Sequence, residues 1–168
     1  MQIVTLTPKR SPTISIEAEN ITPDAFAGKS AAEIGAIGAR EGNEEIKLAD
    51  IFDVAVDGSA DAAGTKIIIE GDALDYLGEH LCGGEIIVKG NVRLLAGVLN
   101  WGGTITIEGD TTLPGGEMKS GTIFVKGKVL EMLPSYKDEG TDEVDGVMYR
   151  KYTGDLSRNG EGVLYVSV

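Results

Sequence analysis

The most constraining feature of this sequence is a near-repetition between residues 66 and 129. Gly71, Gly90 and Gly109 are spaced 19 residues apart, and Gly127 follows after 18. Each of these four glycines follows a short alternating, mostly apolar run that ends in Glu or Lys, and other glycines recur within each unit. The glycines that mark the pattern are Gly71, Gly78, Gly84, Gly90, Gly97, Gly103, Gly109, Gly116, Gly121 and Gly127. A fixed period near 20 residues is typical of proteins in which one short unit stacks on copies of itself.

The apolar runs predict strands rather than helices. Each run holds four or five residues rich in Ile and Val and stops at a glycine, whereas helices normally need ten or more residues. Side chains alternate between the two sides of a strand, so the flanking Ile and Val of each run should line an interior. These residues are Ile67 and Ile69, Ile86 and Val88, Ile105 and Ile107, and Ile123 and Val125.

These features predict a mainly β fold, a single-stranded parallel β-helix (solenoid) of about three or four coils. Glycine supplies the positive-φ conformations that sharp corners require, and we expect them at Gly90 and Gly109. Residues 65–129 would form the β-helix, residues 1–64 an N-terminal cap or docking segment, and residues 130–168 a C-terminal tail with closing strands. An antiparallel barrel also uses short, glycine-bounded strands, but the regular spacing of the units argues against it.

The two ends lack the repeat and predict irregular caps. Thr22-Pro23 predicts the start of a helix. Ser30 to Glu33 has the form of a capping box, which would open a short helix that ends at Gly38. Three extended segments are expected at residues 3–6, 13–16 and 43–56, an acidic loop at 138–145, and closing strands at 148–152 and 162–166.

Composition limits the kinds of partner and the compartment. The chain has 15 Lys and Arg against 27 Asp and Glu, a net charge of −12. This charge opposes binding to nucleic acid and suits either a solvated surface or basic patches on partner proteins. One cysteine can form no internal disulfide and cannot alone hold a structural zinc or a cluster. Without an apolar stretch of about 18 residues or a basic-apolar leader, we expect a cytoplasmic protein that does not bind membranes.

Known catalytic motifs are missing from the sequence. It has no Gly-x-Ser-x-Gly elbow, no Walker loop and no dinucleotide fingerprint after a strand. His80 is the single histidine and is interpreted as a solvent-facing corner residue, and Cys82 as a packing residue rather than a nucleophile. An enzyme that acts alone, such as an esterase, would have to rely on Ser135 or His80.

Polar residues at the start of each unit have a structural interpretation. Asp72 and Asp110 begin their repeats, and Asn91 holds the same position in the second. Asp and Asn at such corners usually cap turns, which we favour over a glycosidase pair of carboxylates. The sequence therefore predicts no catalytic, cofactor-binding or metal-binding residue in this chain.

The repeats resemble those of a known family. Their form, G-(D/N)-x5-G-x4-G-G-x-I-x-V-x-G, is similar to the glycine-rich β-helix shared by the C subunit of formylmethanofuran dehydrogenase and the carboxy-terminal domain of glutamate synthase. The flanks distinguish the two, because residues 23–30 (PDAFAGKS), 133–136 (LPSY) and 150–156 (RKYTGDL) resemble the dehydrogenase subunit. The chain looks like a short form of that subunit, with repeats missing from the middle.

The resemblance implies a non-catalytic scaffold subunit in the formylmethanofuran dehydrogenase complex of methanogenesis. That complex reduces CO2 to formate and transfers the formyl group to methanofuran. The scaffold would bridge a formate dehydrogenase-like molybdopterin subunit and a hydrolase-like subunit. Those partners would carry the molybdopterin with Mo or W, the iron–sulfur clusters and the hydrolase metal site. The alternatives are the corresponding C subunit of a bacterial formyltransferase/hydrolase complex and a stand-alone spacer of the glutamate synthase type.

Overall fold

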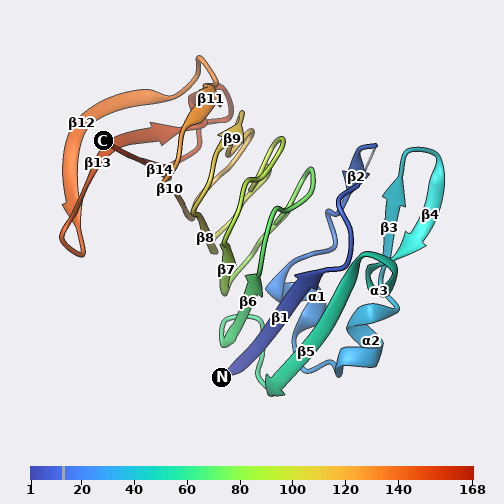
Figure 1. Ribbon diagram of the computed structural model, residues 1–168. Helices are drawn as coiled ribbons and strands as arrows, with labels where there is room; N and C mark the ends of the chain where they lie inside the picture. The colour runs from blue at the N-terminus through green and yellow to red at the C-terminus, as the bar shows by residue number, and fades with distance from the viewer. Residues whose placement is uncertain (13) are drawn as a thin grey trace.

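The computed structural model describes residues 1–12 and 14–168, and its main feature is an open sheet of nine strands (Figure 1). In spatial order these strands are β12 (Lys137–Val144), β13 (Val147–Gly154), β14 (Gly162–Ser167), β10 (Thr122–Val125), β8 (Thr104–Ile107), β7 (Glu85–Val88), β6 (Thr65–Ile69), β1 (Gln2–Pro8) and β5 (Phe52–Gly58). Two small sheets accompany it, one of β11 (Val129–Glu131) and β9 (Thr111–Thr112), the other of β2 (Ile16–Glu17), β3 (Gly38–Glu41) and β4 (Glu44–Lys47). The helices are short: α1 (Pro23–Phe26), α2 (Ala31–Gly35), α3 (Leu48–Ile51) and the 3-10 helix η1 (Leu156–Arg158).

The strands of the repeats form the centre of the large sheet. β6, β7, β8 and β10 pair in parallel and in register, so that equivalent residues of successive repeats lie side by side. The predicted interior rows are confirmed, because Ile67, Ile69, Ile86, Val88, Ile105, Ile107, Ile123 and Val125 are all fully buried. Burying a side chain of this size stabilises a fold by about 1.5–3 kcal/mol relative to leaving it exposed.

The predicted single-stranded β-helix is wrong. The repeat strands belong to a mixed sheet that continues past them, through β1 and the antiparallel β5 on one side and through β14 and the antiparallel β13 and β12 on the other. The rest of each repeat is mostly turn, with isolated bridges from Ala73 to Val92 and from Val92 to Thr111 and the short pair β9–β11. The antiparallel barrel is wrong as well, since the sheet is open at β12 and β5.

The physical reason lies in the ends of the chain. Four short parallel strands alone would leave two unpaired edges, which proteins normally cover. Residues 2–8 and 162–167 have the alternating pattern of strands and pair directly with the first and last repeat strands. The flanking segments are therefore strands of the same sheet rather than irregular caps.

Local signals at the two ends are confirmed in part. Thr22 caps α1 by accepting a hydrogen bond from the backbone N–H of Ala25 (3.0 Å), and Ser30 with Glu33 forms the predicted capping box of α2. α2 ends at Gly35, three residues before the predicted Gly38. The predicted closing strands correspond to β13 and β14.

Three predictions for the ends need correction or lie outside the described chain. Residues 43–56 are not continuously extended, because α3 separates β4 from β5. The acidic residues 138–145 are not a loop and mostly form the edge strand β12, where exposed charges oppose pairing with other proteins. The predicted extended segment 13–16 begins at Thr13, which lies outside the described residues.

One buried hydroxyl in the repeats offers a test of the packing. Thr111 occupies the position that Ala73 and Val92 hold in earlier repeats and is 1% exposed. Its hydroxyl has no hydrogen-bond partner among the residues that the structure describes. Burying such a group costs about 1–3 kcal/mol, so we expect Thr111→Val to raise the free energy of unfolding in urea by about 1 kcal/mol. Thr112→Val, at the half-buried neighbouring position, is the control, and an equal gain there would contradict this explanation.

Candidate docking surface

Three polar side chains join the starts of successive repeats. Asp72 Oδ1 accepts a hydrogen bond from the backbone N–H of Asn91 (2.8 Å), and Asn91 Oδ1 accepts one from Asp110 N–H (2.7 Å). Asp110 Oδ1 in turn accepts from Lys128 N–H (2.7 Å). We name Asp72, Asn91 and Asp110 the Asx ladder. The prediction that these residues cap turns is not confirmed in that form, because each side chain accepts a backbone hydrogen bond from the following repeat.

The repeat glycines have two distinct structural roles. Gly78, Gly84, Gly97 and Gly121 have positive φ, at corners of the chain. Gly90, Gly109 and Gly127 do not, and the positive φ expected for Gly90 and Gly109 is wrong. At these three positions a Cβ would overlap both the backbone of the preceding repeat and a side chain of the Asx ladder. Glycine is therefore needed at these three positions because successive repeats approach each other too closely for a side chain.

In the turn that follows each ladder residue, three residues have positive φ, and only one of the three is a glycine. The positive-φ residues are Tyr76, Gly78 and His80, then Leu95, Gly97 and Leu99, then Leu113, Gly115 and Glu117. In the third unit Gly115 has this role instead of the predicted Gly116, because that unit is one residue shorter.

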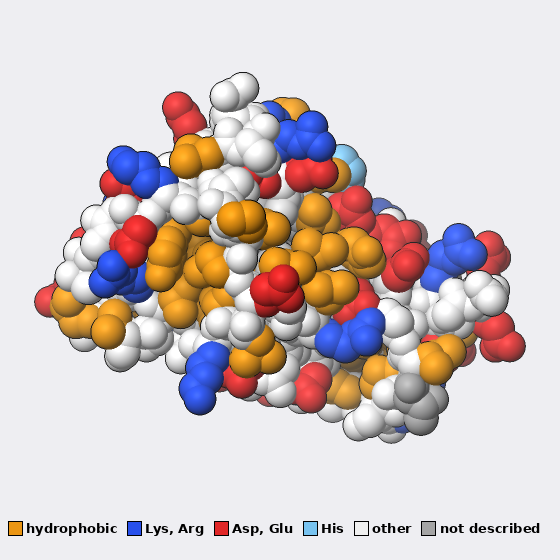
Figure 2. Space-filling model, turned by 90° about the horizontal axis from the view of Figure 1, so that it is seen from above, with side chains coloured by type: hydrophobic (Ala, Val, Ile, Leu, Met, Phe, Trp, Pro, Cys, Tyr) orange, Lys and Arg blue, Asp and Glu red, His pale blue; other side chains and the backbone are white. Residues whose placement is uncertain are grey.

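A groove of about 690 Å³ lies beside the Asx ladder. Its apolar lining comes from Pro8, Pro12, Ala73, Leu74, Val92 and Leu130, and its charged lining from Arg10, Glu70, Asp72, Arg93 and Asp110. The view from above in Figure 2 shows apolar side chains gathered across the middle of this face, with acidic side chains among them. Leu130 is 66% exposed, so the groove presents apolar surface to solvent.

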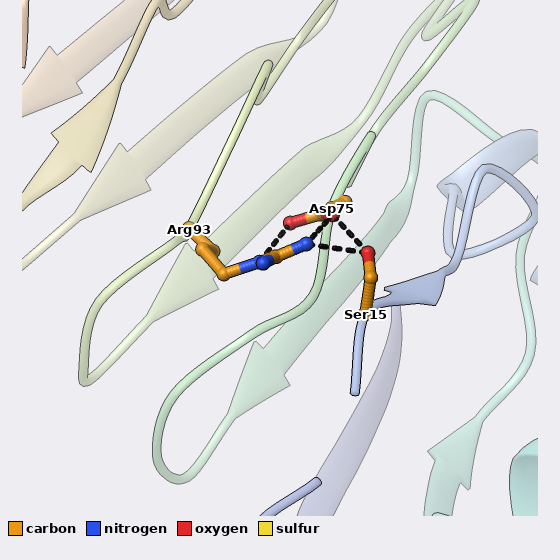
Figure 3. Close-up of polar contacts among 3 residues, drawn as sticks. All are labelled: Ser15, Asp75 and Arg93. Atoms are coloured by element: carbon orange, nitrogen blue, oxygen red, sulfur yellow. Dashed lines mark hydrogen bonds and ion pairs between the residues drawn. The ribbon is translucent and has the colours of Figure 1, made fainter. Parts of the chain in front are cut away.

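A buried carboxylate next to the groove fixes the N-terminal segment on the first repeat (Figure 3). Asp75 is 3% exposed and accepts hydrogen bonds from Arg93 Nε (2.8 Å), Arg93 Nη2 and Ser15 Oγ. Its backbone also pairs with residues 16 and 18. The hydrogen bond to Asp75 raises the pKa of Arg93 above its ordinary value, so the guanidinium stays charged. Sequence reasoning missed this cluster, although an Asp between Leu74 and Leu77 was a signal of a buried, partnered charge.

A second buried carboxylate fixes the C-terminal segment on the third repeat. Asp155 is 4% exposed and accepts hydrogen bonds from Glu117 N–H (3.0 Å), Ser157 N–H (3.0 Å) and Ser157 Oγ (2.6 Å). Burial alone would raise the pKa of Asp155, but hydrogen bonds from Ser135, Ser157 and Glu117 outweigh it and lower the pKa. Burial, and then the charge of Asp155, raise the pKa of the neighbouring Tyr136.

The lowered pKa of Asp155 predicts a pH-dependent contribution to stability. A carboxyl whose pKa is lower in the folded than in the unfolded state stabilises the fold above the unfolded pKa, and this contribution is lost as pH falls through the folded pKa. We expect Asp155→Asn to lower the free energy of unfolding at pH 7, with the difference from wild type shrinking as pH falls below about 4, the ordinary pKa of Asp, and through the lowered pKa of folded Asp155. The exposed Asp57→Asn is the control. A difference from wild type that does not depend on pH would contradict this role for Asp155.

The structure places the three residues considered for catalysis, His80, Cys82 and Ser135, in different surroundings. His80 is exposed at a left-handed corner, as predicted, with its Nε2 3.7 Å from Glu79 Oε1. Cys82 is exposed, so the prediction that it packs inside is wrong, and its thiol donates to the carbonyl of His80 (3.3 Å). Ser135 lies instead beside Asp155.

Two kinds of feature bear on function over residues 1–12 and 14–168: clusters of possible metal ligands and helices that could cross a membrane. No group of three or more His, Cys, Asp or Glu side chains is arranged there to hold a metal ion. Within the same ranges, the helices are all too short or too polar to span a bilayer.

Comparison with known proteins identifies similar chains over half the sequence. No protein-family model matches. Over 87 residues the chain is 45% identical to the C subunit of the tungsten-containing formylmethanofuran dehydrogenase 2 of Methanothermobacter thermautotrophicus, covering 51% of this chain and 32% of that protein. It is 42% identical over 87 residues to the C subunit of the molybdenum-containing formylmethanofuran dehydrogenase 1 of Methanosarcina barkeri, covering 51% and 29%. The matched stretch thus spans about a third of the length of these relatives.

Among solved structures, one similar chain belongs to the formyltransferase/hydrolase complex from Methylorubrum extorquens in complex with methylofuran. The match covers 98% of this chain and 99% of that chain, with 18% sequence identity and a TM-score of 0.41.

Proposed function

We propose that this chain is a non-catalytic subunit of a formylmethanofuran dehydrogenase complex, in the position that the C subunit occupies in its relatives. The observation that carries the proposal is the identity of 42–45% over 87 residues to chains named as that subunit. In this role the chain bridges the formate dehydrogenase-like and the hydrolase-like subunit, so that formate made at one site reaches the other. The similarity covers about half of the chain, and we extend the proposed role to the whole chain.

The shape and rigidity of the chain support a role in holding partners. The neighbouring strands from β1 through the repeats to β14 pair in parallel and in register, and ordered hydrogen bonds of the Asx ladder stiffen the corners. We expect a sheet held in this way to change shape little when a partner binds. A rigid spacer is what two active sites need if they are to stay at a fixed distance.

The proposal assigns every redox and hydrolytic cofactor to neighbouring subunits. The relatives are named as tungsten-containing and molybdenum-containing enzymes, which supports a Mo or W pterin site in the complex. Iron–sulfur clusters and a hydrolase metal site would also belong to those partners. The relation of the repeats to the glutamate synthase domain stays a prediction.

Affinity purification of the tagged full chain from its native host tests the proposal. We expect a molybdopterin subunit and a hydrolase-like subunit to co-purify with the tagged chain. The assembled complex should oxidise formylmethanofuran. The purified chain alone should show no turnover of formate, formylmethanofuran or simple esters. An unrelated tagged protein of similar net charge controls for capture by charge. Co-purification with a glutamine amidotransferase in place of these subunits, or turnover by the isolated chain, would contradict the proposal.

A further inference from the structure

The large sheet has one face on the core and a second face that stays partly open to solvent. Along β6, β7, β8 and β10 buried residues alternate with partly exposed ones, so the partly exposed side chains point away from the core. We name this side of the sheet the outer face. Because the strands pair in register, its central residues form a row across five strands: Ile68, Ile87, Thr106, Phe124 and Tyr165.

The central row is more apolar than a solvated sheet face normally is. Its residues other than Thr106 are aliphatic or aromatic, and each of the five is partly exposed. Phe124 and Tyr165 stack with ring centroids 4.9 Å apart, which holds both rings in place. Parallel strands that are apolar on both sides normally have both sides covered by protein. The outer face therefore has the character of a surface that another chain covers.

Two rows of charged residues border the central row. On one side Lys66 pairs with Glu85 (2.9 Å). On the other side the sign of the charge alternates from strand to strand, at Glu70, Lys89, Glu108 and Lys126, and Lys89 pairs with Glu108 (3.0 Å). The two rows hold three basic and three acidic residues, so this face is neutral although the chain has a net charge of −12. Two copies of the chain can therefore approach each other here without the repulsion that their other surfaces would cause.

The order of the charges is self-complementary. A two-fold axis that lies between two outer faces and runs across the strands places each strand opposite the same strand of a second copy, in the antiparallel direction. Lys66 then lies opposite Glu70 of the second copy, and Glu85 opposite Lys89. Ile68 and Ile87 each lie opposite their own counterpart. A two-fold axis along the strands, between β7 and β8, would instead place the apolar Ile87 opposite the polar Thr106.

We propose that the outer face binds the outer face of a second copy of this chain, with the two-fold axis across the strands. The six parallel strands from β1 to β14 span about 24 Å, and five residues of a strand extend about 17 Å, which gives roughly 400 Å² of flat surface per copy. Stable interfaces bury about 800 Å² per partner, so we expect a dissociation constant in the micromolar range. The inference goes beyond the proposed function, because it adds a second copy of this chain to the assembly.

Sedimentation equilibrium of the purified full chain at several concentrations tests the inference. We expect the mass to rise with concentration toward twice the chain mass of 17.6 kDa. The exchange Lys66→Glu/Glu85→Lys keeps the ion pair within each chain and the net charge, but it places like charges opposite Glu70 and Lys89 of the second copy. We expect this variant to dimerise at least about tenfold more weakly.

A rescue variant separates repulsion between copies from damage to the fold. Adding Glu70→Lys/Lys89→Glu to the first exchange restores opposite charges across the two-fold axis, so the fourfold variant should dimerise within about threefold of wild type. The control Asp138→Arg/Arg150→Asp exchanges an exposed ion pair on the other side of the sheet, since Arg150 alternates with the outward-facing Lys151. This control should dimerise like wild type.

Four results would overturn the inference: a monomer at every concentration, a dimer that the Lys66→Glu/Glu85→Lys exchange leaves unchanged, no recovery in the fourfold variant, or equal weakening by the control. The co-purification experiment tests the proposed function separately. A monomeric chain that assembles with the expected subunits would retain the proposed function and lose only the dimer. A dimeric chain that assembles with none of them would lose only the proposed function.

Discussion

Gly109→Ala should lower the free energy of unfolding by about 3 kcal/mol, because one added methyl group has no space between two repeats. A Cβ at Gly109 would lie 2.7 Å from the carbonyl C and O of Gly90 and would overlap Asn91 Oδ1. The neighbouring backbone cannot move away easily, because two hydrogen bonds hold it in place. Gly109 N–H donates to the carbonyl of Gly90 (2.9 Å), and Asp110 N–H donates to Asn91 Oδ1 (2.7 Å). Urea denaturation followed by far-UV circular dichroism measures the loss.

Gly116→Ala is the matched control for this prediction. Gly116 belongs to the same repeat array and does not have positive φ, and its nearest contact for an added Cβ is Leu95 Cδ2 at 3.4 Å. We expect that variant to change the free energy of unfolding by less than about 1 kcal/mol. Equal stability of the Gly109 and Gly116 variants would mean that close approach between repeats does not select glycine at position 109.

The contrast between these glycines shows how far a repeat in the sequence predicts structure. Equal spacing and alternation were enough to identify the strands at residues 67–69, 86–88, 105–107 and 123–125 and the side chains they bury. The same spacing could not separate a glycine needed for its φ from one needed for lack of a Cβ. That distinction depends on atoms of the preceding repeat, which are far away in the sequence.

The prediction of the overall architecture was wrong for a related reason. Periodicity describes only the repeated part, and residues 2–8 and 162–167 belong to the same sheet without sharing the period. Their alternating pattern predicted extended chain but not a partner, because strand partners are set by which edges are left open. The local helix caps at Thr22 and Ser30 were predictable, since a cap involves residues only three positions apart.

Of the candidate site, only the Asx ladder could be predicted from the sequence. Asp72, Asn91 and Asp110 share a position in the repeat, so their shared role as acceptors of backbone hydrogen bonds follows from the sequence, although the donors lie in the following repeat. The bonds between Ser15, Asp75 and Arg93 join residues up to 78 positions apart and have no periodic signal. A single charged residue inside an apolar stretch indicates that a partner exists without identifying it.

Arg93→Ala should be the most damaging substitution of a charged residue in the repeats. Asp75 is 3% exposed, and loss of the guanidinium would leave its carboxylate buried with Ser15 Oγ as its remaining side-chain donor. Removing one partner of a fully buried pair costs about 3–5 kcal/mol, and because the Arg93 side chain is 62% exposed, water can reach the vacated position. We therefore expect a loss of about 2 kcal/mol in the free energy of unfolding at pH 7.

A double-mutant cycle with Asp75→Asn separates the buried charge from mere loss of packing. Asparagine keeps the shape of Asp75 but carries no charge, so Arg93→Ala should cost less in the Asp75→Asn background, with a coupling of about 1–2 kcal/mol. Arg150→Ala is the matched control for a pair whose partners are both exposed, Arg150 and Asp138, and should change stability little. If Arg93→Ala costs the same with Asp and with Asn at position 75, the ion pair does not hold the N-terminal segment on the repeats, and the backbone bonds of residues 16 and 18 to Asp75 are sufficient to do so.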